Sequence, residues 1–138
     1  MAGREMGSDA GDAAARGGEL NQEITNAVVR TRMRHTGRGP TRAQAFHRGN
    51  VVVVLLSEPL GRTERLLDAN GRRGKVREMR AEVRQAMACD LVRELETLTG
   101  CTVLALLGDS HVDPDVSTEV FVLDRRVGGD ETSAVFAV

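Results

Sequence analysis

The run of six apolar residues Val51–Leu56 constrains the fold of this chain more than any other segment. Its β-branched valines favour extended backbone, and the run is too short for a buried helix, so it predicts a strand. A second, mostly apolar run, Cys101–Leu107, predicts a central strand. Thr118–Leu123 has the composition of another strand, and Ala43–His47 can be extended before a tight connection at Arg48–Asn50. The chain therefore needs helices to cover a sheet.

One long helix is predicted from about residue 76 to 98. Apolar side chains recur there every three or four residues, charged side chains fill the other faces, and Gly100 follows as a stop signal. Such a stripe exceeds what one small sheet can cover, which favours a homodimer. The stripe consists of Val76, Met79, Val83, Met87, Leu91, Leu95 and Leu98.

Two further helices have recognisable ends. Residues from about 20 to 36 have helical apolar spacing and finish with basic residues before Gly37, a typical C-terminal cap. A shorter helix is predicted to begin with Ser57 as its cap and Pro59 in its first turn, and to end near Asn70.

The resulting order, α-β-β-α-α-β-β, predicts an α+β fold. We expect a small mixed or antiparallel sheet of about four strands with the helices packed on one side. The folded domain is predicted over residues 19–124. Residues 1–18 and 125–138 lack apolar periodicity and predict a disordered N-terminal tail and a flexible C-terminal tail.

Composition excludes several classes of function. The chain has 19 Lys and Arg against 20 Asp and Glu, and it has no Trp or Tyr, so a basic nucleic-acid protein with stacking aromatic residues is not expected. No apolar run approaches the ~20 residues that cross a bilayer, and no secretory signal is visible. These features predict a cytoplasmic protein whose cysteines, Cys89 and Cys101, are buried and reduced.

A basic segment is the first candidate site. Residues 24–57 contain no Asp or Glu, and glycines alternate with arginines at their centre. Arginine forks and turn N–H groups bind phosphates and carboxylates, which predicts a site for an anion or an acidic partner. The alternative is a solvated face around a helix cap and a turn. The candidate residues are Arg34, Gly37, Arg38, Gly39, Pro40, Thr41 and Arg42.

An acidic loop is the second candidate site, with Asp109, His111, Asp113 and Asp115 alternating along it. Oxygen and nitrogen ligands at this density could hold a divalent cation. An ordinary structured turn explains the same residues, because Asp side chains bond to nearby backbone N–H groups. No calcium-loop or nucleophile signature is present, so we predict no catalytic residue, metal or cofactor.

Four segments together resemble the MpsC domain family. These are Leu20–Arg30, the Thr36–Thr41 sequence TGRGPT, the strand Val51–Leu56, and His111–Asp115 with the following strand. The resemblance covers residues 20–124. It implies a soluble third component of a sodium-translocating, membrane potential-generating system whose other components are associated with uptake of inorganic carbon. It brings no catalytic residues.

These observations predict a non-enzymatic accessory or regulatory protein that docks on membrane transporter components. Docking would use residues 36–42, which we call the arginine loop. Such a protein would be cytoplasmic and associated with the membrane only through its partner. Two alternatives stay open at this point. One is a small-anion or nucleic-acid binding module that uses residues 36–42, and the other is a metal-assisted enzyme at residues 109–115.

Overall fold

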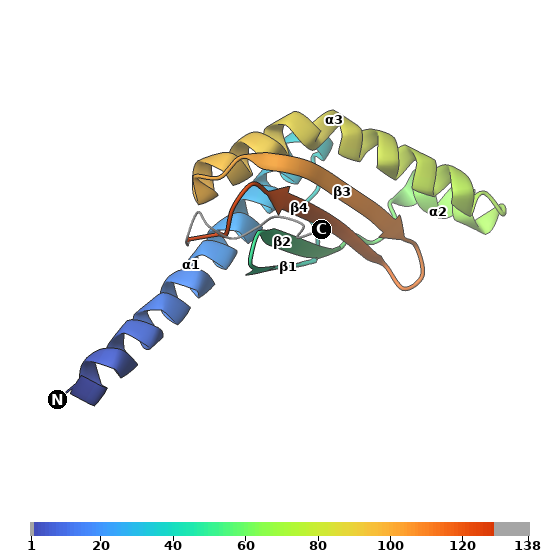
Figure 1. Ribbon diagram of the computed structural model, residues 1–138. Helices are drawn as coiled ribbons and strands as arrows, with labels where there is room; N and C mark the ends of the chain where they lie inside the picture. The colour runs from blue at the N-terminus through green and yellow to red at the C-terminus, as the bar shows by residue number, and fades with distance from the viewer. Residues whose placement is uncertain (1, 129–138) are drawn as a thin grey trace, which may run out of the picture.

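The computed structural model of the chain describes residues 2–128 (Figure 1). It confirms the α+β class and the predicted order of elements. The elements are α1 (Ala2–Thr36), β1 (Arg42–Arg48), β2 (Val51–Ser57), α2 (Arg62–Ala69), α3 (Arg73–Thr99), β3 (Val103–His111) and β4 (Val116–Leu123).

The four strands form one antiparallel sheet in the order β1-β2-β4-β3. The second apolar run is therefore an edge strand and not the predicted central one. β3 and β4 form a hairpin, and β4 inserts beside β2, which leaves β3 outside. The apolar residues of β3 are not buried on both faces, because Leu104 and Leu107 are more than half exposed.

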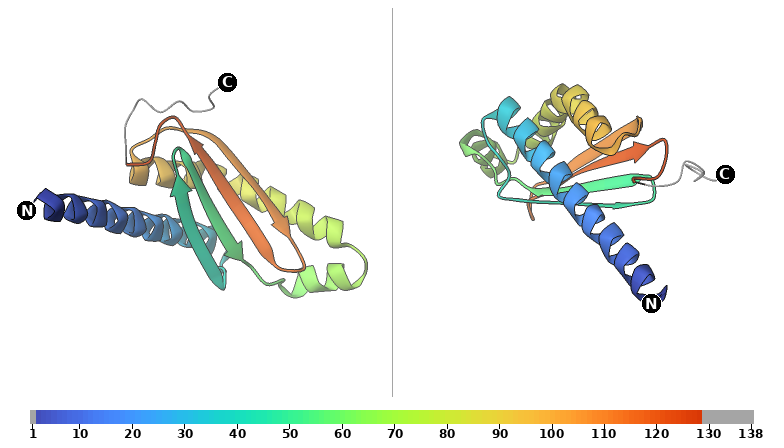
Figure 2. Two further views of the ribbon diagram at one scale, coloured as in Figure 1. Left: turned by 60° about the horizontal axis from the view of Figure 1, so that its bottom comes forward. Right: turned by 90° about the vertical axis from the view of Figure 1, so that its left-hand side faces the viewer.

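Helices α1 and α3 cover one face of the sheet, as the sequence predicts (Figure 2). The core lies between them and the sheet, and it is almost wholly aliphatic. Period-two alternation in β2 sends every second residue into this core. Its central residues are Ile24, Val28, Val52, Val54, Leu56, Met87, Leu91, Leu95, Phe121 and Leu123.

Two helix starts differ from expectation. Helix α1 begins at Ala2, so residues 2–18, expected to be a disordered tail, are helical, and Figure 1 shows this half projecting beyond the sheet. The segment contains no proline, but its five alanines are matched by five glycines, so local propensity does not account for this helix. Ser57 caps no helix, because it pairs with Arg42 at the end of β2; α2 begins only at Arg62, after Gly61.

The glycine signals behave as predicted. Gly100 ends α3 with a positive φ of 70°, and Gly49 turns between β1 and β2 with a φ of 61°. Both positions suit a residue without Cβ. Of the cysteines, Cys101 is buried but Cys89 is exposed on α3, so the prediction of two buried thiols is half wrong; neither forms a disulfide. Most of the predicted C-terminal tail, residues 129–138, lies outside the described residues.

The apolar stripe of α3 is only partly buried. Val76, Met87 and Leu91 are fully buried, whereas Met79 and Val83 keep 42% and 40% of their surface. These two side chains do not form a broad surface patch. They border a cavity beneath the arginine loop.

Candidate functional site: a charged cluster beneath the arginine loop

The arginine loop starts where α1 ends. The N–H of Gly37, which has a φ of 74°, donates to the carbonyl of Met33 at 2.9 Å and closes the helix. The hydroxyl of Thr36 then accepts a hydrogen bond from the N–H of Arg38 at 3.2 Å. The chain proceeds through Gly39 and Pro40, and the N–H of Thr41 joins the sheet by donating to the carbonyl of Ser57 at 2.9 Å.

The arginines of this loop differ in what they contact. Arg34 lies 3.3 Å from Asp90 of α3, and the same carboxylate accepts from His35 at 2.7 Å, which holds the pKa of Asp90 below its usual range. The guanidinium of Arg38 donates to the carbonyl of Pro59 at 3.2 Å. Arg42 is exposed on β1. The predicted site residues therefore do not converge on one point.

Gly61 allows Arg38 to reach this position. A Cβ on Gly61 would lie 2.6 Å from Nη1 of Arg38, closer than any ordinary contact. The loop that follows α1 is thereby joined to the segment that precedes α2. This contact needs glycine for space and not for backbone conformation.

The acidic loop sends its side chains to separate partners. Asp109 lies 3.5 Å from Arg77, and a hydrogen bond from the N–H of Ser110 lowers the pKa of Asp109. His111 contacts the carbonyl of Pro114 through Nδ1 at 2.8 Å. Among the side chains that the structure describes, residues 15–128, no three His, Cys, Asp or Glu gather as metal ligands would.

The two loops meet at Glu58 and Pro59. Asp115 of the acidic loop accepts a hydrogen bond from the N–H of Glu58 at 2.9 Å, and Arg38 binds the next carbonyl. Arg38 and Asp115 are thus linked through the short segment between β2 and α2. The sequence does not predict this link, because it depends on how β2 leaves the sheet.

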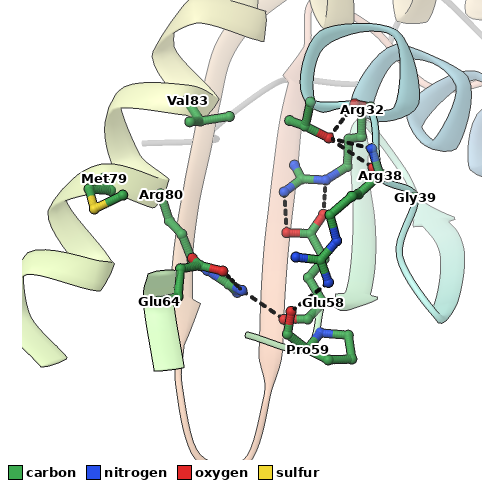
Figure 3. A pocket seen from close by; sticks show the side chains of 10 residues that line it. Arg32, Arg38, Gly39, Glu58, Pro59, Glu64, Met79, Arg80 and Val83 are labelled. Carbon is green, nitrogen blue, oxygen red and sulfur yellow. Dashed lines mark hydrogen bonds and ion pairs between the residues drawn. The ribbon is translucent and has the colours of Figure 1, made fainter. Parts of the chain in front are cut away.

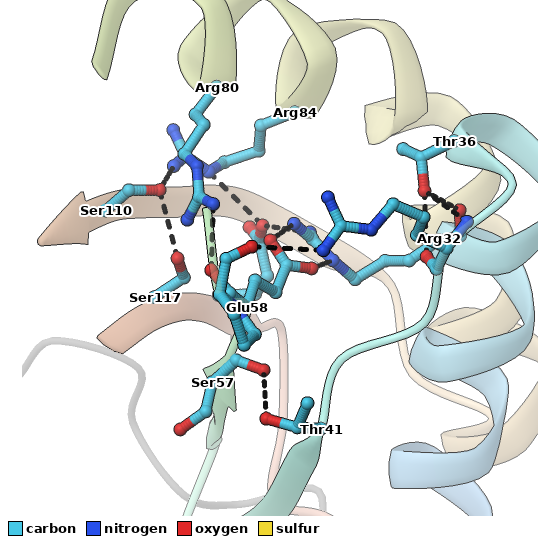
Figure 4. Close-up of polar contacts among 12 residues, drawn as sticks. Arg32, Thr36, Thr41, Ser57, Glu58, Arg80, Arg84, Ser110 and Ser117 are labelled. Atoms are coloured by element: carbon cyan, nitrogen blue, oxygen red, sulfur yellow. Dashed lines mark hydrogen bonds and ion pairs between the residues drawn. The ribbon is translucent and has the colours of Figure 1, made fainter. Parts of the chain in front are cut away.

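Beneath this link lies a buried charged cluster that sequence reasoning missed (Figure 4). Arg32 of α1 donates through two nitrogens to the carboxylate of Glu58 and places Nη1 3.5 Å from Glu119 of β4. Arg84 of α3 lies 3.2 Å from the same Glu119, and it donates to Ser110 at 2.8 Å. The cluster joins both helices to the sheet.

Glu119 is the most deeply buried charged residue of the cluster, with 1% of its surface exposed. Burial raises the pKa of this carboxyl to about 7, although the nearby guanidiniums of Arg84 and Arg32 favour the charged form. Its two carboxylate oxygens make no hydrogen bond of good geometry. Desolvation thus opposes ionisation of Glu119 more strongly than the two guanidiniums favour it.

At Glu64 hydrogen bonds and nearby charge outweigh the effect of burial on the pKa. Burial alone would raise its pKa, but hydrogen bonds from Arg80 and from the N–H of Gly61 hold that pKa below the usual value. Arg80 binds Glu64 at 2.7 Å and also donates to the carbonyl of Glu58 at 2.8 Å. This pair fastens α2 to α3.

A cavity of about 230 Å³ opens between the end of α1, the start of α2 and the middle of α3 (Figure 3). Arg32, Arg38 and Arg80 form its polar wall together with Glu58 and Glu64. Figure 3 shows these side chains directed toward one another. The arrangement offers hydrogen-bond donors and paired charges, which suits binding of a polar group.

One signal in the sequence could have revealed the cluster. In β4, Ser117, Glu119, Phe121 and Leu123 fall on one face by alternation, and Phe121 and Leu123 identify that face as the inner one. A carboxylate at an inward position requires a buried partner. The partners Arg32 and Arg84 have no comparable signal, because arginines also occur throughout the exposed faces of both helices.

Comparison with protein families finds one match. The family is described as "Na+-translocating membrane potential-generating system (MpsC)", and the match spans residues 16–125, which include the whole sheet and all of α2 and α3. Comparisons with curated proteins and with solved structures find no match. Within residues 2–128, no helix has the length and apolarity needed to cross a membrane. Because the match covers most of its length, the chain belongs to the MpsC family.

Proposed function

We propose that this chain is a non-enzymatic accessory or regulatory protein of a Na+-translocating membrane potential-generating system. In this proposal it docks on a membrane component of that system through Arg38 and Arg42, here called the docking pair. Family membership supports the link to the system. The arrangement of the arginines supports the docking surface.

The observation that best supports the proposal concerns the exposure and the ion-pair partners of the docking pair. Arg38 and Arg42 are exposed, and neither lies within ion-pair distance of a carboxylate among residues 15–128, whose side chains the structure describes. Arg32 and Arg34, in the same acid-free segment, both have carboxylate partners. Guanidinium groups without an internal carboxylate partner are suited to an acidic group on another protein.

The geometry around Arg38 favours binding further. Its guanidinium is already fixed by Pro59 and by the space at Gly61, so a partner would not have to order it. The charge of Arg38 helps to lower the pKa of Glu64, but Glu64 forms its ion pair with Arg80, and Glu58 forms its own with Arg32. Arg38 therefore retains donors for a partner. The arrangement supports a binding role, which requires neither a nucleophile nor a general base.

Replacement of both members of the docking pair by alanine tests the proposal. Tagged wild-type protein and the variant Arg38→Ala, Arg42→Ala are used to capture partners from gently solubilised membranes of the native host. We expect a membrane component to co-purify with the wild type and to be lost with the variant. Equal recovery of the same component with both proteins would contradict docking through this pair.

A second candidate function is binding of a small anion, which the three arginines of the cavity favour. Inorganic phosphate and bicarbonate are suitable probes, because both present oxygens to guanidinium groups. Binding by titration calorimetry that weakens with added salt, and that is lost in Arg38→Ala, would support this candidate. An absence of heat with both probes would remove it. A nucleic-acid ligand is a less suitable candidate, because aromatic stacking residues are scarce.

A further inference from the structure

The sheet face opposite α1 and α3 is largely apolar and uncovered by any described helix. In the left view of Figure 2 the strands lie in front of both helices, with this face toward the viewer. We call it the outer face. The strand pairing and alternation assign to it Arg42, Gln44, Phe46 and Arg48 of β1, Val51, Val53, Leu55 and Ser57 of β2, Val116, Thr118, Val120 and Val122 of β4, and Ala105, Leu107, Asp109 and His111 of β3.

Four large side chains on the outer face remain accessible, although Val122 on the same face is buried, with 5% of its surface exposed. Phe46 is 43% exposed, Leu107 is 60% exposed, and Leu55 and Val116 are 38% and 40% exposed. Isolated exposed apolar residues are ordinary, but a contiguous apolar sheet face marks an interaction surface. The run Val51–Leu56 that dominates the sequence fits this view, because a strand apolar on both faces requires cover on both.

The strand register arranges these residues in rows across the sheet. Phe46 lies opposite Val53, Val53 opposite Val120, and Val120 opposite Leu107, so one row is apolar from edge to edge. The neighbouring row runs from Gln44 through Leu55 and Thr118 to Asp109. The apolar row is thus continuous over all four strands.

We propose that the outer face binds the outer face of a second copy of this chain, about a two-fold axis parallel to the strands. This axis preserves the position of each residue along the strand direction, so each row of one copy faces the same row of the other. It reverses the order of the strands, so β1 of one copy faces β3 of the other. Phe46 of each copy then lies over Leu107 of the other, and Val53 lies over Val120. Sheets that pack face to face bury side chains in this manner, with strand directions within about 30° of each other.

The charges at the two edges of the face agree with this axis. Arg42 and Arg48 lie on β1 at one edge. Asp109 lies on β3 at the opposite edge, where it pairs with Arg77 at 3.5 Å but keeps 74% of its side chain exposed. Reversal of the strand order brings the basic edge of each copy toward the acidic edge of the other. A two-fold axis perpendicular to the strands would instead stack the two basic edges, and like charges would repel.

The size of the face is sufficient for a dimer. Strands about 4.8 Å apart, with residues on one face roughly 6.7 Å apart, give the outer face a flat area of roughly 500 Å². Two copies would therefore bury roughly 1,000 Å², which is about the smallest area expected of a biological interface. Arg42 belongs both to the docking pair and to the basic edge of this face. The variants that test the dimer therefore leave Arg42 unchanged, so that loss of dimerisation and loss of docking can be told apart.

Sedimentation equilibrium of the complete chain tests the proposal, since the monomer mass is 14.9 kDa. We expect the wild type to have twice this mass at micromolar concentration. Phe46→Lys and Leu107→Glu should each yield monomers, because each places an uncompensated charge in the apolar row. The double variant Phe46→Lys, Leu107→Glu should dimerise again, because the proposed axis pairs each lysine with a glutamate of the other copy.

Leu66→Glu is the matched control, because Leu66 is 64% exposed on α2 and lies off the outer face. It should remain dimeric, and circular dichroism should confirm that every variant is folded. A wild type that stays monomeric at all concentrations would overturn the proposal. So would single variants as dimeric as the wild type, or a chain that dimerises only after residues 129–138 are removed, which would show that this segment occupies the face.

Discussion

Nε of Arg84 lies 3.2 Å from Oε1 of Glu119, and Gly108 makes the approach of these two side chains possible. Gly108 pairs with Glu119 across β3 and β4, and the side chain of Arg84 descends from α3 onto the space above the glycine. A Cβ at this position would lie 2.6 Å from Cδ of Arg84 and 2.7 Å from Oε2 of Glu119. Because Gly108 of β3 has no side chain, Arg84 can approach the buried carboxylate of Glu119 on the neighbouring β4.

Gly108→Ala is expected to destabilise the protein by about 1–3 kcal/mol, because the added methyl group overpacks the Arg84–Glu119 contact. Gly74→Ala is the matched control, since a Cβ at Gly74 in α3 meets nothing within 4 Å. Alanine should stabilise that helix by about 0.5–1 kcal/mol. Urea denaturation measures both. Equal effects of the two substitutions would show that the space above Gly108 is not needed.

Glu119 should make stability depend on pH between about 4.5 and about 7. Its pKa is raised to about 7 in the folded protein from an ordinary value of 4.5, so the folded state holds the proton more tightly than the unfolded state. The stabilisation is fully present below 4.5 and is lost as the pH rises through 7. The groups that face this carboxyl are Arg32, Arg84 and Glu58.

Glu119→Gln removes the titration and should flatten the decline in unfolding free energy between pH 5 and 7, which amounts to at most about 3 kcal/mol. The slope with pH is the decisive quantity, because glutamine also changes the contacts of Arg32 and Arg84. The wild type and the variant should be compared by urea denaturation at several pH values. Identical slopes would show that Glu119 ionises at its ordinary pKa.

Arg32→Ala should destabilise the protein by about 3–5 kcal/mol, because it leaves Glu58 without its ion-pair partner and Glu119 with Arg84 alone. Arg30→Ala, at an exposed position on the same helix, should change stability by less than about 0.5 kcal/mol. In the Glu119→Gln background the cost of Arg32→Ala should be smaller, since one of the two carboxylates beside Arg32 then carries no charge. A cost that is unchanged in this background would mean that Arg32 acts only through Glu58.

The sequence was sufficient to predict most of the elements, because their signals are local. Gly100, Gly49 and the apolar run Val51–Leu56 each specify a backbone conformation without distant residues. The position of β3 at the sheet edge was predicted wrongly, since strand order depends on pairing between distant segments. Ser57 was misread as a helix cap for the same reason: its pairing with Arg42 extends β2 past the expected end.

The candidate site was only partly predictable. The arginine loop is visible in the sequence because residues 24–57 contain no acid. The sequence does not show that Arg34 is paired while Arg38 and Arg42 are not, because this depends on where the fold places Asp90. The charged cluster could be suspected only from Glu119. Its completion by Arg32 from one helix and Arg84 from another follows from packing of those helices on the sheet, which no local pattern encodes.

The most direct test of the central claim is quantitative capture from native membranes with two matched double variants. Arg38→Ala, Arg42→Ala removes the docking pair, and Arg72→Ala, Arg126→Ala removes the same charge from two exposed positions outside the loop. Mass spectrometry should recover a membrane component with the wild type and the second variant, but not with the first. Recovery that is equal with all three proteins, or reduced equally in both variants, would contradict docking through Arg38 and Arg42.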